Sequence, residues 1–330
     1  MKHNDDAFVT MLLMVQINPQ REELVLPLSW AEWHQLRENV LASDFAHLGR
    51  LLEIDMSALI ITLGCTEDEA YRLCMLLGRT LPLSISYEQM LGAGIDVMTY
   101  EERPYPAKLR EKLGKKSPPL LYIRGRPEMF RQPAIAVLGA NAPKPDVEAR
   151  VKLLARQAAE AGYVVVVDGR NGAGMVAAHE AMRHGGYAAL VLAGDFADFS
   201  HRAEIESLLE DRRITIITPF HPDAPYTPSH ANQRNKLIYA LSDAAFVFSC
   251  EEGKGSTWAG AVEALRGKYC DFIYALDTDQ HSGNRQLIQR GAMRMPNLSE
   301  MGIKALSGFW QSAAAEQLCL FDWRSNMDLY

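Results

Sequence analysis

Long apolar runs are absent from the sequence, and none approaches the roughly 18–20 residues that a membrane-spanning helix needs. The start of the chain, MKHNDDAFVTMLLMV, is acidic before a short apolar patch and has no small-residue cleavage site. It therefore does not predict a signal peptide. From these two absences we expect a cytoplasmic protein that has no membrane partner.

Cysteine is also scarce, with five residues in 330 and no C-x-x-C pair. This usage argues against a disulfide framework and against a cysteine-based zinc site, so we expect the thiols at buried apolar positions. The nine histidines show no metal-ligand spacing. The sequence therefore predicts no metal and no other cofactor.

The strict fingerprints of common nucleotide-binding and hydrolytic enzymes are missing too. No G-x-x-x-x-G-K-[ST] is present, and GRNGAG at residues 169–174 has the spacing G-x-x-G-x-G instead of G-x-G-x-x-G. These departures argue against a P-loop nucleoside triphosphatase and against NAD as a ligand. No G-x-S-x-G context or Ser-His-Asp order stands out. We assign no catalytic residue and favour a protein that is not an enzyme.

Basic residues are in the minority, with a net charge of −7, but the imbalance is concentrated in one part of the chain. Residues 1–100 hold 6 basic and 14 acidic side chains, whereas residues 101–300 hold 26 basic and 24 acidic ones. A local basic crevice in the second part is compatible with these counts. Charge therefore permits nucleic-acid binding without indicating it.

What is present begins with a small helical module at residues 1–90. Ser29 with Glu32, and Thr66 with Glu69, form capping-box patterns ahead of apolar residues at helical spacing. No catalytic spacing occurs in this part of the sequence.

The sequence pattern changes in residues 91–300. Short runs rich in Val and Ile, such as AIAVLGA and YVVVVDG, alternate with helical stretches of about ten to twenty residues. Runs that are apolar on both faces predict an α/β, Rossmann-like fold, in which a mostly parallel sheet carries helices on both faces. Residues 301–330 are expected to form a C-terminal tail.

Polar and small residues follow several of these runs. In an open parallel sheet, ligands bind beyond the carboxyl ends of the strands, where the crossover direction changes. Gly-rich loops that lead into helices present backbone N–H groups to an anion, so we predict one phosphate-binding crevice at this edge. Its candidate residues are Gly139, Asn141, Lys144, Gly169, Arg170, Arg234, Asn235, Lys236, Gly253, Lys254, Gly255, Ser256, Thr257 and Arg285.

A plainer interpretation stays open for these residues. The glycines could only make tight turns, Arg234 could pair with a carboxylate, and Asn235 could cap its helix. We expect His179, Tyr239 and Trp258 to serve the core instead of a ligand, although the two aromatic rings could stack on bases.

Three stretches follow one another along the chain: GIDVMTYEERPYPAKLREKLGKKSPPLLYIRG from Gly94, QRNKLIYALSD from Gln233, and SGNRQLIQRGA, which ends at Ala292. In this order they resemble the DprA/Smf family of DNA-processing proteins over about two-thirds of the chain. The family's Gly-Ser-Arg after the first core strand is Gly-Ala-Asn here, ending at Asn141, so its arginine is missing. We also expect this chain to lack the winged-helix C-terminal domain that many members carry. The chain is thus identified as a divergent member.

This resemblance implies a function and partners. The crevice would hold the phosphate backbone of single-stranded DNA, and the protein would be a homodimeric recombination mediator that assists RecA loading. A different class of function stays open. DGRNGAGMVAA and GKGSTWAGAVE are similar to loops of the LOG-type nucleotide phosphoribohydrolases of the same superfamily. The same crevice could then serve a sensor or hydrolase of a nucleotide-derived small molecule.

The tail contains a segment, Gln317-Leu318-Cys319-Leu320-Phe321, that resembles the Q-L-x-L-F peptide docking into the bacterial sliding clamp. Gln317 would hydrogen-bond at the rim of the clamp pocket, while Leu318, Leu320 and Phe321 would fill an apolar cleft. The alternative is that these apolar side chains pack on the protein's own core.

Overall fold

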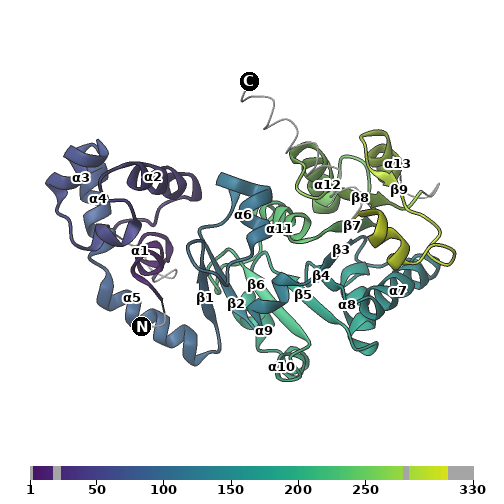
Figure 1. Ribbon diagram of the computed structural model, residues 1–330. Helices are drawn as coiled ribbons and strands as arrows, with labels where there is room; N and C mark the ends of the chain where they lie inside the picture. Colours follow the sequence, from purple (N-terminus) through teal and green to yellow (C-terminus); the bar gives the residue numbers. More distant parts are fainter. Residues whose placement is uncertain (1–2, 18–23, 278–281, 311–330) are drawn as a thin grey trace. The chain divides into compact units, whose positions relative to one another are not determined.

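The computed structural model describes residues 3–17, 24–277 and 282–310. Two compact units divide the chain: Met1–Arg131 with Val191–Arg234, and Gln132–Leu190 with Asn235–Tyr330. Figure 1 labels the helices and strands of both units.

The first unit starts with helices, as the sequence predicts. They are α1 (Asp5–Met14), α2 (Trp30–Ala42), the 3₁₀ helix η1 (Leu48–Leu52), α3 (Met56–Leu63), α4 (Glu67–Leu77) and α5 (Thr80–Gly92). Both predicted capping boxes are present, at the first turns of α2 and α4. Trp33, with no exposed surface, lies in a core made mostly of leucines and valines from α1, α2, η1, α3 and α4.

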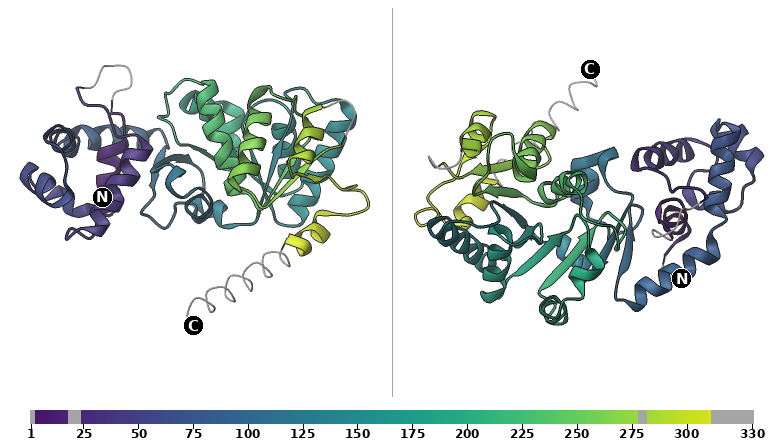
Figure 2. Two further views of the ribbon diagram at one scale, coloured as in Figure 1. Left: turned by 90° about the horizontal axis from the view of Figure 1, so that it is seen from above. Right: turned by 180° about the vertical axis from the view of Figure 1, so that it is seen from behind.

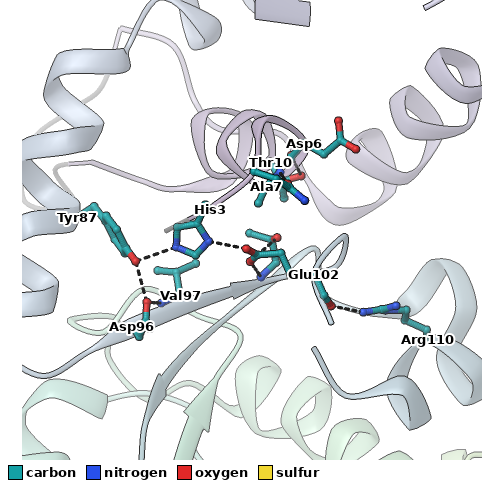
Figure 3. Close-up of polar contacts among 11 residues, drawn as sticks. His3, Asp6, Ala7, Thr10, Tyr87, Asp96, Val97, Glu102 and Arg110 are labelled. Carbon is teal, nitrogen blue, oxygen red and sulfur yellow. Dashed lines mark hydrogen bonds and ion pairs between the residues drawn. The ribbon is translucent and has the colours of Figure 1, made fainter. Parts of the chain in front are cut away.

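A polar network holds the first described residues against α5 and the strand β1 (Asp96–Thr99), as Figure 3 shows. His3 Nδ1 lies 2.8 Å from Glu102 Oε1, and His3 Nε2 lies 2.8 Å from the hydroxyl of Tyr87. The Tyr87 hydroxyl in turn donates to Asp96 Oδ1 at 2.8 Å. Burial raises the pKa of Glu102, but the hydrogen bond and charge of His3 together with the hydrogen bonds from Thr99 outweigh it, so this pKa lies below its ordinary value.

Replacing Glu102 by glutamine is expected to lower the free energy of unfolding by about 1–3 kcal/mol at about pH 7. Because folding lowers the pKa of Glu102, the carboxylate stabilises the fold above its unfolded-state pKa. That contribution disappears as the pH falls through the folded-state pKa, so the difference in stability between the variant and the wild type should shrink as the solution is acidified. Urea denaturation over this range measures the difference, with the exposed Glu88→Gln as the control. A difference that stays constant down to the acid limit contradicts the expectation.

The rest of the first unit contains three antiparallel strands. β1 pairs with β2 (Leu120–Arg124), and β2 pairs with β6 (Ile214–Thr218). The accompanying helices are α6 (Ala107–Leu113), η2 (Gly114–Lys116), η3 (Pro127–Arg131), α9 (Phe196–Ser200) and α10 (Ala203–Glu210). These two pairs are antiparallel, whereas the strand pairs within the second unit are parallel.

The second unit holds parallel strands in the order β5-β4-β3-β7-β8-β9. They are β3 (Ala134–Leu138), β4 (Val164–Val167), β5 (Tyr187–Val191), β7 (Ala244–Val247), β8 (Phe272–Ala275) and β9 (Met293–Arg294). The chain builds outward from β3 to β5 and then returns to place β7 on the other side of β3. This reversal is the change of crossover direction beside which ligands bind in such sheets. The predicted α/β class with a mostly parallel sheet is confirmed.

The helices that connect these strands are α7 (Pro145–Glu160), α8 (Ala173–Arg183), α12 (Gly255–Gly267) and α13 (Ser282–Gln289), and α11 (Pro228–Leu241) leads into β7. Every residue of β3, β4 and β7 is buried, which explains why these runs are apolar throughout. Figures 1 and 2 show α7 and α8 side by side, where both pack on β4. Among the described residues, no helix has the length and apolar character to cross a membrane.

Candidate phosphate-binding site

The loops that follow β3 and β4 cross in close contact at the carboxyl edge of the sheet. A Cβ atom added at Gly172 would lie 2.5 Å from the carbonyl oxygen of Ala140 and 2.7 Å from Cα of Asn141. Gly172 has φ +138° and ψ −158°, a backbone conformation that is essentially restricted to glycine. Directly after it, the N–H of Ala173 donates to the Ala140 oxygen at 3.1 Å. The crossing therefore requires glycine at this position.

A narrow pocket opens beside the crossing, with a cavity volume of ≈ 10 Å³, room for about one water molecule. Its lining brings together a subset of the predicted residues, namely Gly139, Asn141, Arg170, Asn235, Ser256 and Thr257. It also contains residues that sequence reasoning missed, namely Asp168, Asn171, Gly172 and Gly174. The pocket thus joins the ends of β3 and β4 to the start of α12, next to the point where the crossover direction changes.

Asn235 fixes the first turn of α12 at this pocket. The side chain is 2% exposed, and its Nδ2 donates to the carbonyl oxygen of Ser256 at 2.6 Å. A Cβ at Gly260, one turn further along α12, would come within 2.8 Å of the same nitrogen. The first N–H groups of a helix have no acceptor within it, so this turn is a suitable partner for an anion.

Three of the predicted basic residues form ion pairs: Lys236 with Glu263 at 3.0 Å, Lys254 with Glu251 at 3.4 Å, and Arg285 with Asp277 at 3.7 Å. The side chains of Lys254 and Arg285 are 78% and 54% exposed. Such surface pairs contribute at most about 1 kcal/mol, so a phosphate can replace the carboxylate at low cost. Lys236 is only 24% exposed, and its pair with Glu263 links α11 to α12.

The environment of Arg234 differs from that of the other basic candidates. Its side chain has no exposed surface, and one guanidinium nitrogen donates to the carbonyl oxygen of Val191, the last residue of β5, at 3.1 Å. This burial favours a structural role for Arg234 over contact with a ligand.

The remaining candidates lie in loops or at the first residue of a helix, as Gly255 does in α12. Gly169, Gly253 and Gly255 have φ of +69°, +70° and +74°, so all three turn the chain in the left-handed region. Lys144 is exposed directly before α7, which begins at Pro145.

The three residues expected to serve the core differ in outcome. Tyr239 has no exposed surface, which confirms its core position. Trp258 is half-buried, and the guanidinium of Arg290 lies over its ring at 5.5 Å. His179 is exposed, so a core position for it is wrong. The physical reason is helical periodicity, because the buried face of α8 is taken by its alanines.

Two buried polar residues at this edge were missed by the sequence reasoning. Ser249 Oγ accepts a hydrogen bond from the N–H of Ala140 at 2.7 Å and so ties the end of β7 to the β3 loop. Asn284 makes hydrogen bonds to the segments that follow β7 and β8. The available signal was a polar residue directly after an apolar run, and an asparagine inside a recognised motif.

These loops and helix ends define an α/β protein with a candidate anion-binding site at the carboxyl edge of its parallel strands. Within the described residues, no group of three or more His, Cys, Asp or Glu side chains is placed to hold a metal ion. The family model for DNA recombination-mediator protein A matches residues 96–305. The chain belongs to this family.

The solved structures that are similar to this chain include two DNA processing proteins. DNA processing protein A from Streptococcus pneumoniae has a TM-score of 0.60 and 17% identity, with 82% of this chain and 95% of that chain covered. DNA processing protein A from Helicobacter pylori, a protein with a unique single-stranded DNA binding mode, has a TM-score of 0.53 and 20% identity, with 68% and 98% covered. At these identities the likeness concerns the fold. No curated protein matches the chain.

Proposed function

We propose that this chain is a recombination mediator that binds single-stranded DNA through its phosphate backbone at the pocket beside the Gly172 crossing. The observation that carries the proposal is the convergence of the loop after β3, the glycine-rich loop after β4 and the start of α12 on one narrow pocket. Backbone N–H groups and a helix N-terminus favour an anion there without reading a base, as a sequence-tolerant DNA binder requires. Family membership and the single-stranded DNA binding of the Helicobacter pylori relative support it.

The size of the pocket favours a polymer backbone over a free nucleotide. Pockets that enclose small organic ligands have volumes of about 300–1,000 Å³, whereas this cavity measures ≈ 10 Å³. It can take a phosphate oxygen at its mouth but not a base and a sugar. Glu263, the acid on α12 that a hydrolase could use, is engaged by Lys236 at 3.0 Å. We therefore prefer the DNA-binding function to the sensor or hydrolase.

Binding to a fluorescent oligothymidylate tests the proposal. The logarithm of the affinity should fall linearly with the logarithm of the salt concentration, with a slope of about −0.7 for each phosphate neutralised. Lys254→Ala is expected to reduce the magnitude of this slope by about 0.7 and to leave stability unchanged, since its pair with Glu251 is exposed. Lys268→Ala, at the opposite end of α12, is the matched control and should keep the wild-type slope. Absence of binding at low salt, or binding that ignores salt, would refute the function.

Three finer parts of the proposal rest on the family resemblance. These are a cytoplasmic location, RecA as a partner that the bound protein helps to load, and a homodimer in which two crevices grip one strand. Light scattering should give twice the chain mass of 36.8 kDa at micromolar concentration. A single species of the chain mass across that range would remove the homodimer.

The clamp-binding segment, with Gln317, Leu318, Leu320 and Phe321, lies outside the described residues. It stays a proposal on its sequence alone. A fluorescent peptide of residues 312–326 should bind purified sliding clamp, and Ala at Leu320 and Phe321 should abolish that binding. A peptide that does not bind the clamp would leave the segment without this partner.

A further inference from the structure

Asn284, on the first turn of α13, lies at the centre of a set of hydrogen bonds that join two strand ends. Its side chain has no exposed surface. The Oδ1 atom accepts from the N–H of Cys250 at 2.9 Å and from the Cys250 thiol at 3.2 Å. The Nδ2 atom donates to the carbonyl oxygens of Leu276 at 2.8 Å, Phe248 at 3.1 Å and Val247 at 3.3 Å.

This pattern uses the full capacity of a carboxamide, which has two N–H donors and an oxygen with two lone pairs. Burial raises the pKa of the Cys250 thiol to about 12, so the thiol keeps its proton at neutral pH and can donate it. The surrounding carbonyl oxygens can only accept hydrogen bonds, so the amide nitrogen of Asn284 has to face them. A carboxylate or an apolar side chain of similar size cannot meet this pattern.

The backbone that Asn284 holds leads directly into the candidate site. Cys250 is followed by the loop from Glu251 to Lys254, and this loop leads into α12. The fit is tight, because a Cβ at Gly283 would lie 2.7 Å from the carbonyl oxygen of Cys250. The first turn of α13 therefore presses on the segment from which the loop departs, and the amide fixes its direction.

We infer that Asn284 is a positioning residue for DNA binding: it touches no strand itself but holds the Glu251–Lys254 loop where Lys254 and the start of α12 meet the phosphates. This inference deepens the proposed function and rests on it for the identity of the ligand. The positioning itself can be measured without any ligand.

The experiment compares Asn284→Leu, which removes every polar contact at similar volume and adds no charge, with the wild type. Asn284→Ser is the fallback variant if the leucine protein does not fold. Ser242→Ala is the matched control, because it removes the buried hydrogen bond from Ser242 Oγ to the Ile238 oxygen, at 2.9 Å, at the end of α11 just before β7. Hydrogen exchange of the free proteins and the salt dependence of oligothymidylate binding are measured for each.

In Asn284→Leu, amides from Ser249 to Thr257 should exchange at least about tenfold faster, while those of β4 and α7 keep their protection. The magnitude of the salt slope should fall by about 0.7 or more, since at least one phosphate contact is lost. Ser242→Ala should change neither quantity. Loop exchange equal to that of the control overturns the inference, and so does faster exchange throughout the second unit with an unchanged salt slope. If the wild type binds no oligonucleotide, the proposed function fails, and the exchange pattern still decides the positioning role.

Discussion

Replacing Gly172 by alanine is expected to lower the free energy of unfolding by about 3–5 kcal/mol. Two costs add at this position. The backbone conformation, with φ +138° and ψ −158°, is one that a residue with a Cβ avoids. The new methyl group would also lie 2.5 Å from the Ala140 oxygen and 2.7 Å from Asn141 Cα, which are backbone atoms that cannot rotate away. The loops after β3 and β4 must then separate.

Gly162→Ala measures the conformational cost alone, so its comparison with Gly172→Ala gives the cost of the close approach. Gly162 also has a positive φ, of +78°, but a Cβ there has no atom within 4 Å. This control should lose only the conformational cost, about 1–2 kcal/mol. Urea denaturation gives both values, and oligothymidylate titration at low salt shows whether the folded Gly172→Ala protein keeps its affinity. We expect the affinity to fall because the crossing forms a wall of the pocket. Equal losses of stability in the two variants would show that the close approach costs nothing.

Most of the fold could be predicted because its signals are local. Capping boxes at Ser29 and Thr66 specify helix starts within one turn, and a strand buried on both faces, such as β4, needs an apolar residue at every position. The antiparallel pairing of β1, β2 and β6 was not predicted in the same way. Parallel and antiparallel strands can both be short apolar runs, so the run itself does not indicate the direction of the neighbouring strand.

The site was predicted less completely, for a physical reason. The sequence motifs that resemble the DprA/Smf family contain polar residues that the structure buries: Arg234, Asn235, Ser242 and Asn284. Hydrogen bonds of Arg234, Asn235 and Asn284 hold strand ends and the start of α12, so much of the recognisable motif marks the framework of the edge. Exposed residues such as Lys254 and Arg285 contribute charge. Gly172 was not predicted as a site residue. Glycine is required there because of a loop about thirty positions earlier in the chain, and no local sequence pattern spans that distance.

Arg234→Met is expected to lower the free energy of unfolding by about 2–4 kcal/mol and to leave the salt slope of DNA binding unchanged. The guanidinium of Arg234 has no exposed surface and donates to the Val191 oxygen at 3.1 Å. Methionine keeps a similar length but cannot donate, so the carbonyl at the end of β5 loses a buried hydrogen bond. A buried guanidinium releases no counterion when a phosphate binds, so it contributes nothing to the slope.

Lys254→Ala is the counterpart, with a reduced slope and unchanged stability, because Lys254 is 78% exposed. Arg234→Lys adds a second test, since an ammonium keeps the charge but not the planar fork of donors that a guanidinium provides. We expect its stability to lie between those of the wild type and the methionine variant, again with the wild-type slope. Urea denaturation and oligothymidylate titration at three salt concentrations measure both quantities for each protein. A salt slope of smaller magnitude in Arg234→Met, at unchanged stability, would show that Arg234 contacts a DNA phosphate. The phosphate contact implied by the family motif would then replace the structural role.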